Sequence, residues 1–306
     1  MTTSIVSKTS SQGYVDDARN DDVLIYVNGQ FFRRDEAKVS VFDAGFVLGD
    51  GVWEGIRLVK GRIVALDDHL DRLYEGARAI ELDIGLTREQ MIEAIWATFN
   101  KNEMTDGAHA RLMVTRGRKK TPNQDPRFAL GKPTIVIVAE YKTPRPESKE
   151  TGLSLFTSTI RCSGPDVFDL RLNSHSRLNF IQALIQAINA GADEALMLDP
   201  HGFVASCNST NFFIVRGSEL WTSTGRFNFK GITRQKVINL YKRHGGIVRE
   251  HDFTLAEVYS ASEAFVTGTL GGITPVSHID GRKIGTGQPG AITQKIASLY
   301  ADFISS

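Results

Sequence analysis

The stretch LNFIQALIQAINAGADEALMLDPHGFVASCNSTNFFIVRGSELWTS, residues 178–223, contains the pattern that decides the fold. It opens with apolar residues at helical spacing, which predict an amphipathic helix that ends at Gly191. EALMLD and NFFIV follow as predicted strands, and the turn at 199–202 has Pro and Gly where a type I turn prefers them. This part of the chain is therefore predicted to mix helices with buried strands.

The same alternation extends in both directions along the chain. VLIYV, Asn-Gly and QFF at 23–32 form the strongest short-range signal for a β-hairpin. Residues 40–66 are apolar stretches separated by glycines and are predicted as further strands. Helices are predicted over 67–80, from a Thr87 N-cap with Gln90 three residues later, after the capping box at 254–257, and over 291–304.

Composition divides the chain into domains. TPRPESKETG, residues 143–152, has two prolines and few apolar residues and is predicted as an interdomain linker. It separates a small N-terminal α/β domain, 23–142, from a larger C-terminal domain, 153–306. Residues 1–22 are polar and are predicted to be a disordered or loosely docked tail.

Charge and cysteine content narrow the possible functions. The 306 residues include 36 basic and 35 acidic side chains, so a net charge of +1 gives no electrostatic argument for a nucleic acid or an acidic membrane. Two cysteines cannot form a disulfide framework, and no apolar run approaches the roughly 20 residues that span a bilayer. We therefore expect a soluble cytoplasmic protein. We expect no metal site, since no CxxC or HExxH motif occurs.

Three places have the chemistry of an anion site. Gly231-Ile232-Thr233 opens a predicted helix, whose first N–H groups and positive dipole end suit a phosphate, although for the tripeptide alone a plain helix start with an N-cap threonine is the simpler explanation. The turn at 267–272, TGTLGG, would let the backbone approach a ligand closely, or is an ordinary glycine-rich turn. Arg72 lies one helical turn after His69 and could bind a phosphate or carboxylate, or could be a solvated surface arginine.

Weaker candidates have simple structural explanations. The polar cluster 173–177 precedes a helix and is typical of capping, and the polar loop 206–210 is typical of turn chemistry. Arg116 begins a basic loop, RGRKK, that either gates an anionic substrate or is a solvated charged surface.

The order of these signals resembles a known family. DAGFVLGDGVWEGIR (43–57), HLDRLYEGA (69–77), GADEALMLD (191–199), STNFFIV (209–215), KGITRQKVI (230–238) and VTGTLGGITPV (266–276) together resemble the class IV aminotransferases, the fold-type IV pyridoxal-phosphate (PLP) enzymes. The resemblance runs from about residue 23 to the C-terminus. It implies a two-lobed α/β (α+β) fold, a homodimer, and PLP at the interface between the lobes.

The resemblance also assigns roles to individual residues. Arg72 matches the phosphate-binding arginine of the family, and Ile232, Thr233 and Thr269 match its other phosphate contacts. Phe229 stands where an apolar residue packs on the pyridine ring. Trp53 and Glu54 would border the substrate pocket, and Arg116 is placed near it. These matches predict that the three anion sites form one phosphate cup.

Two catalytic positions depart from the family pattern. The lysine that holds PLP as a Schiff base is replaced by Asn173, and no lysine occurs between Lys149 and Lys230. The glutamate expected against the pyridine nitrogen is replaced at Ser206-Cys207. Asparagine can neither form an imine nor act as a base, and serine cannot hold a proton on the ring nitrogen by charge.

Three functions are consistent with this sequence. The first is an aminotransferase-like protein for a small amino-acid or keto-acid substrate, with non-covalent PLP or an unusual base such as Lys230. The second is a PLP-independent hydrolase, lyase or isomerase that has no cofactor and uses Asn173, His175, Ser206 and Cys207, with His175 as base and Cys207 or Ser206 as nucleophile. The third is a non-catalytic binder of PLP or another phosphorylated metabolite. A fold retained for dimerisation alone would not explain why the phosphate residues are kept.

Overall fold

The protein is described by a computed structural model that covers residues 10–306. Two compact units divide the chain. The N-terminal unit consists of Val15–Thr143 with Leu172–Arg177. The C-terminal unit consists of Pro144–Arg171 and Leu178–Ser306 together with residues 10–14. Each unit has its own sheet and its own apolar core.

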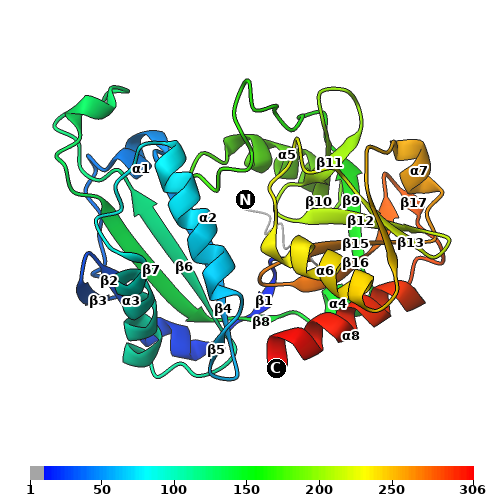
Figure 1. The fold of residues 1–306 in the computed structure, drawn as a ribbon, viewed down its shortest axis with the longest axis horizontal. Coiled ribbons are helices and arrows are strands. Elements are labelled where there is room, and N and C mark those ends of the chain that lie inside the picture. Colours follow the sequence, from blue (N-terminus) through cyan, green and yellow to red (C-terminus); the bar gives the residue numbers. More distant parts are fainter. Residues whose placement is uncertain (1–9) are drawn as a thin grey trace, which may run out of the picture. The chain divides into compact units, whose positions relative to one another are not determined.

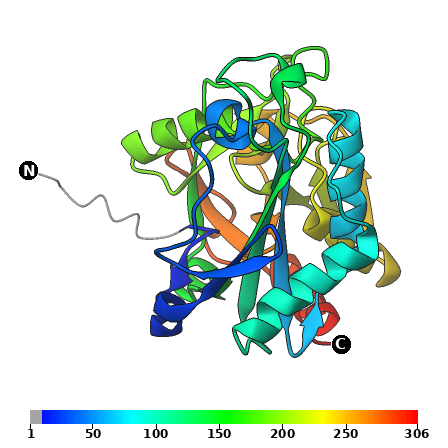
Figure 2. The same ribbon diagram turned by 90° about the vertical axis from the view of Figure 1, so that its left-hand side faces the viewer.

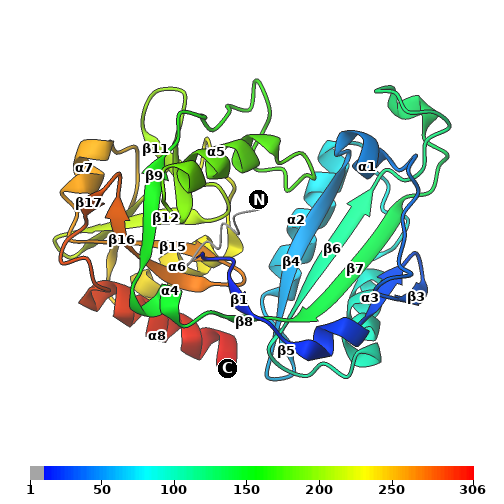
Figure 3. The ribbon, with the colours of Figure 1, turned by 180° about the vertical axis from the view of Figure 1, so that it is seen from behind.

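The N-terminal unit is a six-stranded sheet in the order β3-β2-β7-β6-β4-β5. Helices α2 and α3 cover one face of this sheet, and the other face is seen from behind in Figure 3. The two helices run in clearly different directions in Figure 2. The elements are η1 (Ala18–Asp22), β2 (Leu24–Val27), β3 (Gln30–Arg33), α1 (Ala44–Leu48), β4 (Gly51–Val59), β5 (Arg62–Ile63), α2 (Leu66–Ala79), α3 (Arg88–Lys101), β6 (Ala108–Thr115), η2 (Pro126–Phe128) and β7 (Thr134–Tyr141).

Alternation along the strands explains which face is covered. Val52, Ile56 and Leu58 of β4 point to the helices and are buried with Leu70 and Leu73 of α2. The hairpin is confirmed, because Asn28 and Gly29 both have positive φ, 50° and 90°, as a two-residue type I′ turn requires. The capping box of Thr87 and Gln90 at the start of α3 is also confirmed.

The prediction of strands throughout 40–66 is wrong at its start. Residues 44–48 form the short helix α1, because the Asp43 side chain accepts a hydrogen bond from the Gly45 N–H at 2.8 Å and so caps a helical turn. Gly49, at φ 70°, ends the helix in the left-handed conformation before β4 begins. An aspartate cap and a terminal glycine therefore outweigh the apolar pattern of AGFVL.

The C-terminal unit is built on a nine-stranded sheet in the order β11-β10-β9-β16-β15-β12-β13-β14, with β17 paired to β16. Helices α6 and α8 pack together against it, and Figure 1 shows α8 in red at the end of the chain. The elements are α4 (Glu147–Glu150), β9 (Leu153–Thr157), α5 (Leu178–Asn189), β10 (Glu194–Leu198), β11 (Val204–Cys207), β12 (Asn211–Arg216), β13 (Glu219–Thr222), α6 (Ile232–Arg243), β14 (Ile247–Glu250), α7 (Leu255–Tyr259), β15 (Glu263–Gly268), β16 (Gly272–Ile279), β17 (Arg282–Lys283) and α8 (Ala291–Ser305).

The domain boundaries differ from those expected. Residues 172–177 belong to the N-terminal unit. The predicted linker 143–152 contains helix α4 and strand β8 (Thr143–Pro144), which pairs with β1 (Tyr14–Val15). The prediction of a loose tail is wrong for residues 10–22, because Ser11 is buried and its N–H donates to the Glu194 carboxylate at 2.8 Å. Residues 1–9 of that predicted tail lie outside the described residues.

Candidate functional site

The start of helix α6 in the C-terminal unit has no side-chain cap among the described residues. Gly231 occupies the N-cap position, and a Cβ there would lie 2.1 Å from Asn211 Oδ1, so only glycine fits. The Asn211 Nδ2 donates to the Phe229 carbonyl at 2.7 Å and fixes the approach to the helix. The first N–H groups of α6 are thus the kind of donors that bind an anion.

Helix α8 shows how this unit satisfies such a helix start when it caps one internally. The Glu263 carboxylate accepts hydrogen bonds from the N–H groups of Ile292 at 3.0 Å and Thr293 at 2.7 Å, and from the Thr293 hydroxyl at 2.7 Å. Thr233 occupies a similar early position in α6 and is buried, but no carboxylate caps that helix in the described part of the chain. The comparison favours an external anion at α6.

The turn between β15 and β16 lies beside the α6 start. Asn211, which contacts the α6 start, is the cross-strand neighbour of Thr267 on β15. The hydroxyl oxygens of Tyr300 and Thr233 lie 3.5 Å apart. A Cβ on Gly272 would lie 3.3 Å from the Tyr300 ring, so this ring bridges helix and turn. The structure therefore brings together two of the three predicted anion-binding elements, those of Thr233 and Thr269.

Thr267 adds a polar group beside this turn, and Lys149 holds the backbone of the turn in place. The Thr267 hydroxyl is buried and has no hydrogen-bond partner among the described residues, which is a costly state for a polar group. The Lys149 ammonium donates to the carbonyls of Gly271 and Ile273 and fixes the backbone after half-buried Thr269. An unpartnered hydroxyl next to a fixed turn fits a phosphate or another small anion.

Arg72, the third predicted anion-binding element, belongs to the N-terminal unit and contacts Glu54 there. Its Nε and Nη2 donate to the two Glu54 oxygens at 2.7 and 2.6 Å, and the His69 Nδ1 lies 2.7 Å from Oε2. Burial alone would raise the pKa of Glu54, but the charge and hydrogen bonds of Arg72, with those of His69, lower it overall. The sequence predicts Glu54 at the border of a substrate pocket, whereas the structure buries it completely. A shared phosphate contact of Arg72 with Thr233 stays a prediction.

Asn173, which the family resemblance predicts at the position of the family lysine, is buried with its amide engaged on both sides. Its Nδ2 donates to the Trp53 carbonyl and lies 3.4 Å from Glu54 Oε1, while its Oδ1 accepts a hydrogen bond from Arg177. Backbone pairing supports the side chain, since the Trp53 N–H donates to the Asn173 carbonyl at 2.9 Å. This amide joins β4 to the segment 172–177 and offers no amine and no base.

The proposed nucleophile and base do not form a pair within either unit. Burial raises the pKa of the Cys207 thiol well above its usual value, and Ser206 donates its hydroxyl proton to the Thr210 carbonyl at 2.8 Å. His175 belongs to the N-terminal unit, and burial lowers its pKa to about 4. The structure therefore argues against Cys207 or Ser206 as a nucleophile, because burial keeps the thiol protonated and, among the described residues of the C-terminal unit, the Ser206 hydroxyl donates to a carbonyl and not to a base.

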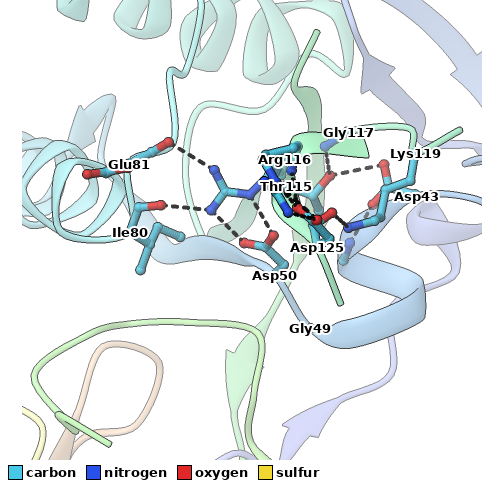
Figure 4. A network of polar contacts seen from close by, with 12 residues as sticks. Asp43, Gly49, Asp50, Ile80, Glu81, Thr115, Arg116, Gly117, Lys119 and Asp125 are labelled. Carbon is cyan, nitrogen blue, oxygen red and sulfur yellow. Dashed lines mark hydrogen bonds and ion pairs between the residues drawn. The ribbon is translucent and has the colours of Figure 1, made fainter. Parts of the chain in front are cut away.

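Arg116 joins two parts of the N-terminal unit, as Figure 4 shows. Its guanidinium makes a bidentate pair with Asp50, at 2.6 and 3.0 Å, and also donates to the carbonyls of Ile80 at 2.7 Å and Glu81 at 2.9 Å. These contacts close the C-terminal end of α2, so they favour a structural role over the predicted place near the substrate. The basic loop is not a simple solvated surface either, because Lys119 is buried and donates to the Asp125 carbonyl at 2.8 Å.

Sequence reasoning missed Arg111 beside Trp53, and it named Arg177 only as a member of the polar cluster 173–177. The Arg111 guanidinium carbon lies 3.4 Å from the centre of the Trp53 ring, and that of Arg177 lies 5.6 Å from it. The signal available was the alternation in AHARLMVT, which places Arg111 on the opposite face of β6 from buried Ala110 and Leu112. Among the described residues, no cluster of three metal-ligating side chains occurs. No helix in that part of the chain is long and apolar enough to cross a bilayer.

Known proteins resemble this chain in both sequence and fold. Residues 51–279 match the model for the family amino-transferase class IV. A putative branched-chain-amino-acid aminotransferase of Methanocaldococcus jannaschii is 43% identical over 279 residues, which cover 91% of this chain and 95% of the relative. Branched-chain-amino-acid aminotransferase-like protein 2 of Arabidopsis thaliana is 38% identical over 297 residues, 97% of this chain but 53% of its own length.

The chain spans about half the length of that plant relative. It also covers 50% of branched-chain-amino-acid aminotransferase-like protein 1 from the same plant. Among solved structures, the branched-chain amino acid aminotransferase of T.th. with pyridoxamine 5'-phosphate has a TM-score of 0.88 at 30% identity. The match covers 93% of this chain and 94% of that one. The mixed α/β fold predicted from sequence is confirmed as that of the fold-type IV aminotransferases.

Proposed function

Because the chain belongs to the class IV aminotransferase family, we propose that it binds a PLP-type phosphorylated cofactor without a covalent link. The observation that carries this proposal is the contrast between two positions. Asn173 has an amide, fully engaged by Trp53 and Arg177, where the family resemblance expects the lysine. The α6 start, in contrast, keeps N–H donors without an internal cap among the described residues.

The phosphate would be held by the C-terminal unit. Ile232 and Thr233 would donate their N–H groups, the Thr233 hydroxyl would add a further bond, and Thr269 would close the site from the turn. The unpartnered Thr267 hydroxyl supports the fit, because an anion or its bound water would satisfy it. Phe229, half-buried next to Gly231, is the proposed apolar support for the ring. Arg72 is a further proposed phosphate contact.

A bound cofactor of this kind would supply an electron-withdrawing ring next to a small amino-acid or keto-acid ligand. This chain offers no amine at residue 173 to carry a proton, and Ser206 donates its own proton to a carbonyl. We therefore expect no lysine-dependent transamination, and we propose a cofactor-holding protein with non-standard chemistry at most. No observation favours the cofactor-free hydrolase, lyase or isomerase, since Cys207 is held as a buried thiol.

We also propose a homodimer that uses helix α5. Leu178, Ile181 and Ile185 recur at helical spacing and are 66%, 52% and 50% exposed. An apolar stripe of this kind on a described helix suits contact with a second copy of the chain.

Titration with pyridoxamine 5'-phosphate tests the cofactor proposal, because this probe has no aldehyde and cannot react with surface lysines. Calorimetry should detect one site in the wild type and at least a tenfold weaker affinity in Thr233→Val, about 1.4 kcal/mol, since valine keeps the shape but loses the hydroxyl. Thr293→Val is the matched control, because its helix start is already filled by Glu263 and its affinity for the probe should not change. A wild type that does not bind the probe, or an unaffected Thr233→Val, contradicts the proposal.

A further inference from the structure

Glu194 is a buried carboxyl group that is not among the proposed phosphate contacts. It begins strand β10 in the C-terminal unit and is only 1% exposed. In the described part of the chain no lysine, arginine or histidine pairs with it, and its polar contacts are hydrogen bonds from Ser11 and Thr210. A carboxyl group withdrawn from water costs stability unless donors surround it. The two residues that supply these donors therefore indicate what the carboxyl group does.

The two oxygens of Glu194 hold two separate segments of the chain. Oε1 accepts a hydrogen bond from the Ser11 N–H at 2.8 Å and another from the Ser11 hydroxyl. Oε2 accepts a hydrogen bond from the hydroxyl of Thr210, in the loop between β11 and β12, at 3.3 Å. Burial raises the pKa of Glu194 overall, although the hydrogen bonds from Ser11 and Thr210 act in the opposite direction.

Both of these segments touch the turn between β15 and β16. A Cβ on Gly271 would lie 2.7 Å from the Ser11 carbonyl oxygen. A Cβ on Gly268 would lie 3.3 Å from the Thr210 Cγ2 methyl group. Glycine permits this close approach because it has no side chain. Glu194 therefore acts on both ends of the turn through the two residues that it holds.

Residues 10–14, which we call the N-terminal strap, are fixed at a second place as well. The Gly13 N–H donates to the Ser10 carbonyl at 3.1 Å and closes a turn within the strap. Arg145 then binds the end of the strap, because its N–H donates to the Gly13 carbonyl at 3.2 Å and its Nε to the Tyr14 carbonyl at 3.0 Å. The strap thus presents the Ser11 carbonyl to the turn from a defined position.

We propose that Glu194 is a positioning residue for the turn at 268–272, and that the N-terminal strap it holds controls how firmly this turn binds an anion. Thr269 lies between the two glycines that Ser11 and Thr210 contact, so a shift of either support would displace it. The control of anion binding rests on the proposed phosphate site. The positioning of the turn concerns the fold of the C-terminal unit and does not depend on that site.

Hydrogen exchange of the unliganded protein, measured by mass spectrometry, tests the positioning role. Glu194→Leu keeps a similar volume but loses both acceptor oxygens, so we expect the amides of residues 268–272 to exchange about tenfold faster. Glu194→Gln keeps an acceptor for Ser11 and should restore exchange to within about twofold of the wild type. Asp280→Ala is the control, because its carboxylate accepts from the Thr157 hydroxyl at 2.6 Å beyond the far end of β16. It should leave exchange in the turn unchanged.

Ser11→Pro supplies the result if Glu194→Leu does not fold. This variant removes the N–H and the hydroxyl that Glu194 binds, but it changes the strap and no strand of the sheet. We expect the same acceleration at 268–272, about tenfold, and unchanged exchange in helix α8. Titration with pyridoxamine 5'-phosphate then measures the consequence for binding. Both variants should bind this probe about tenfold more weakly than the wild type, and Glu194→Gln should bind it like the wild type.

The outcomes separate this inference from the cofactor proposal. Unchanged exchange at 268–272 in both Glu194→Leu and Ser11→Pro would overturn the inference and leave Lys149 as the residue that holds the turn. Equal acceleration in Asp280→Ala, no rescue in Glu194→Gln, or faster exchange without any loss of affinity would also overturn it. A wild type that does not bind pyridoxamine 5'-phosphate contradicts the cofactor proposal, and the exchange rates then decide for or against the positioning role.

Discussion

Glu54 shows at the scale of one residue what a buried charge requires. A carboxylate withdrawn from water is stable only when donors surround it, and here Arg72 and His69 supply three contacts of 2.6–2.7 Å. The Asn173 side-chain amide adds a weaker contact, with Nδ2 at 3.4 Å from Glu54 Oε1. The resemblance of VWEGIR and HLDRL to family motifs predicts both Glu54 and Arg72 as site residues, but it does not predict that they pair with each other.

Removing this charge should cost stability. We expect Glu54→Gln to lower the free energy of unfolding by about 3–5 kcal/mol, because Arg72 and His69 lose their buried partner. The folded-state pKa of Glu54 is lowered, so its stabilising effect is present above the ordinary glutamate pKa and is lost as the pH falls through the lowered value. Urea unfolding at neutral and acidic pH should therefore show a gap from wild type that narrows in acid.

Glu75→Gln provides the control on the same helix. Glu75 is exposed on α2, so its replacement should change the unfolding free energy by no more than about 0.5 kcal/mol at either pH. A Glu54→Gln variant as stable as Glu75→Gln would show that the buried pair contributes nothing to the fold.

Helix α6 shows at the scale of an element how one glycine positions the proposed anion site. Any side chain at residue 231 would enter the space of Asn211 Oδ1, whose amide also holds the Phe229 carbonyl. The sequence predicts this helix start and its glycine, because the tripeptide Gly231-Ile232-Thr233 precedes an apolar helical pattern. It does not predict the contact with Asn211, because this residue lies twenty positions earlier in the sequence, at the start of strand β12.

This contact predicts a coupled pair of mutations. Gly231→Ala should destabilise the protein by about 1–3 kcal/mol and weaken pyridoxamine 5'-phosphate binding, because the new methyl group displaces Asn211. Asn211→Ala in the same chain should relieve the clash, so the stability losses of the two single variants should not add in the double variant. Chemical unfolding of all four proteins measures the coupling, and additive losses would contradict the contact.

At the scale of the whole molecule, the sequence predicted the features that depend on neighbouring residues better than those that depend on contacts between distant residues. The hairpin at Asn28-Gly29 and the capping box at Thr87 depend on neighbouring residues and are confirmed. The assignment of residues 172–177 to the N-terminal unit and the bond from Ser11 to Glu194 depend on partners more than a hundred positions away. No periodicity encodes such partners, so the sequence misplaced both segments.

The exposed stripe on α5 should determine the oligomeric state. Ile181→Lys combined with Ile185→Lys places two charges on the proposed contact, so we expect sedimentation to detect monomers where the wild type forms dimers. Ile247→Lys on β14 is the control, since Ile247 is 52% exposed but lies on another element. A wild type that sediments as a monomer, or a double variant that remains dimeric, would contradict the assignment of α5 as the contact.

The central claim is that this chain holds its cofactor without a covalent bond. The most direct measurement adds one equivalent of PLP, reduces the complex with borohydride, denatures the protein and determines the mass of the intact chain. We predict that the cofactor leaves with the denaturant and that the main species has the mass of the unmodified chain, beside only minor adducts spread over several surface lysines. One stoichiometric adduct on a single lysine, with Lys149 and Lys230 the nearest in sequence to residue 173, would contradict the claim.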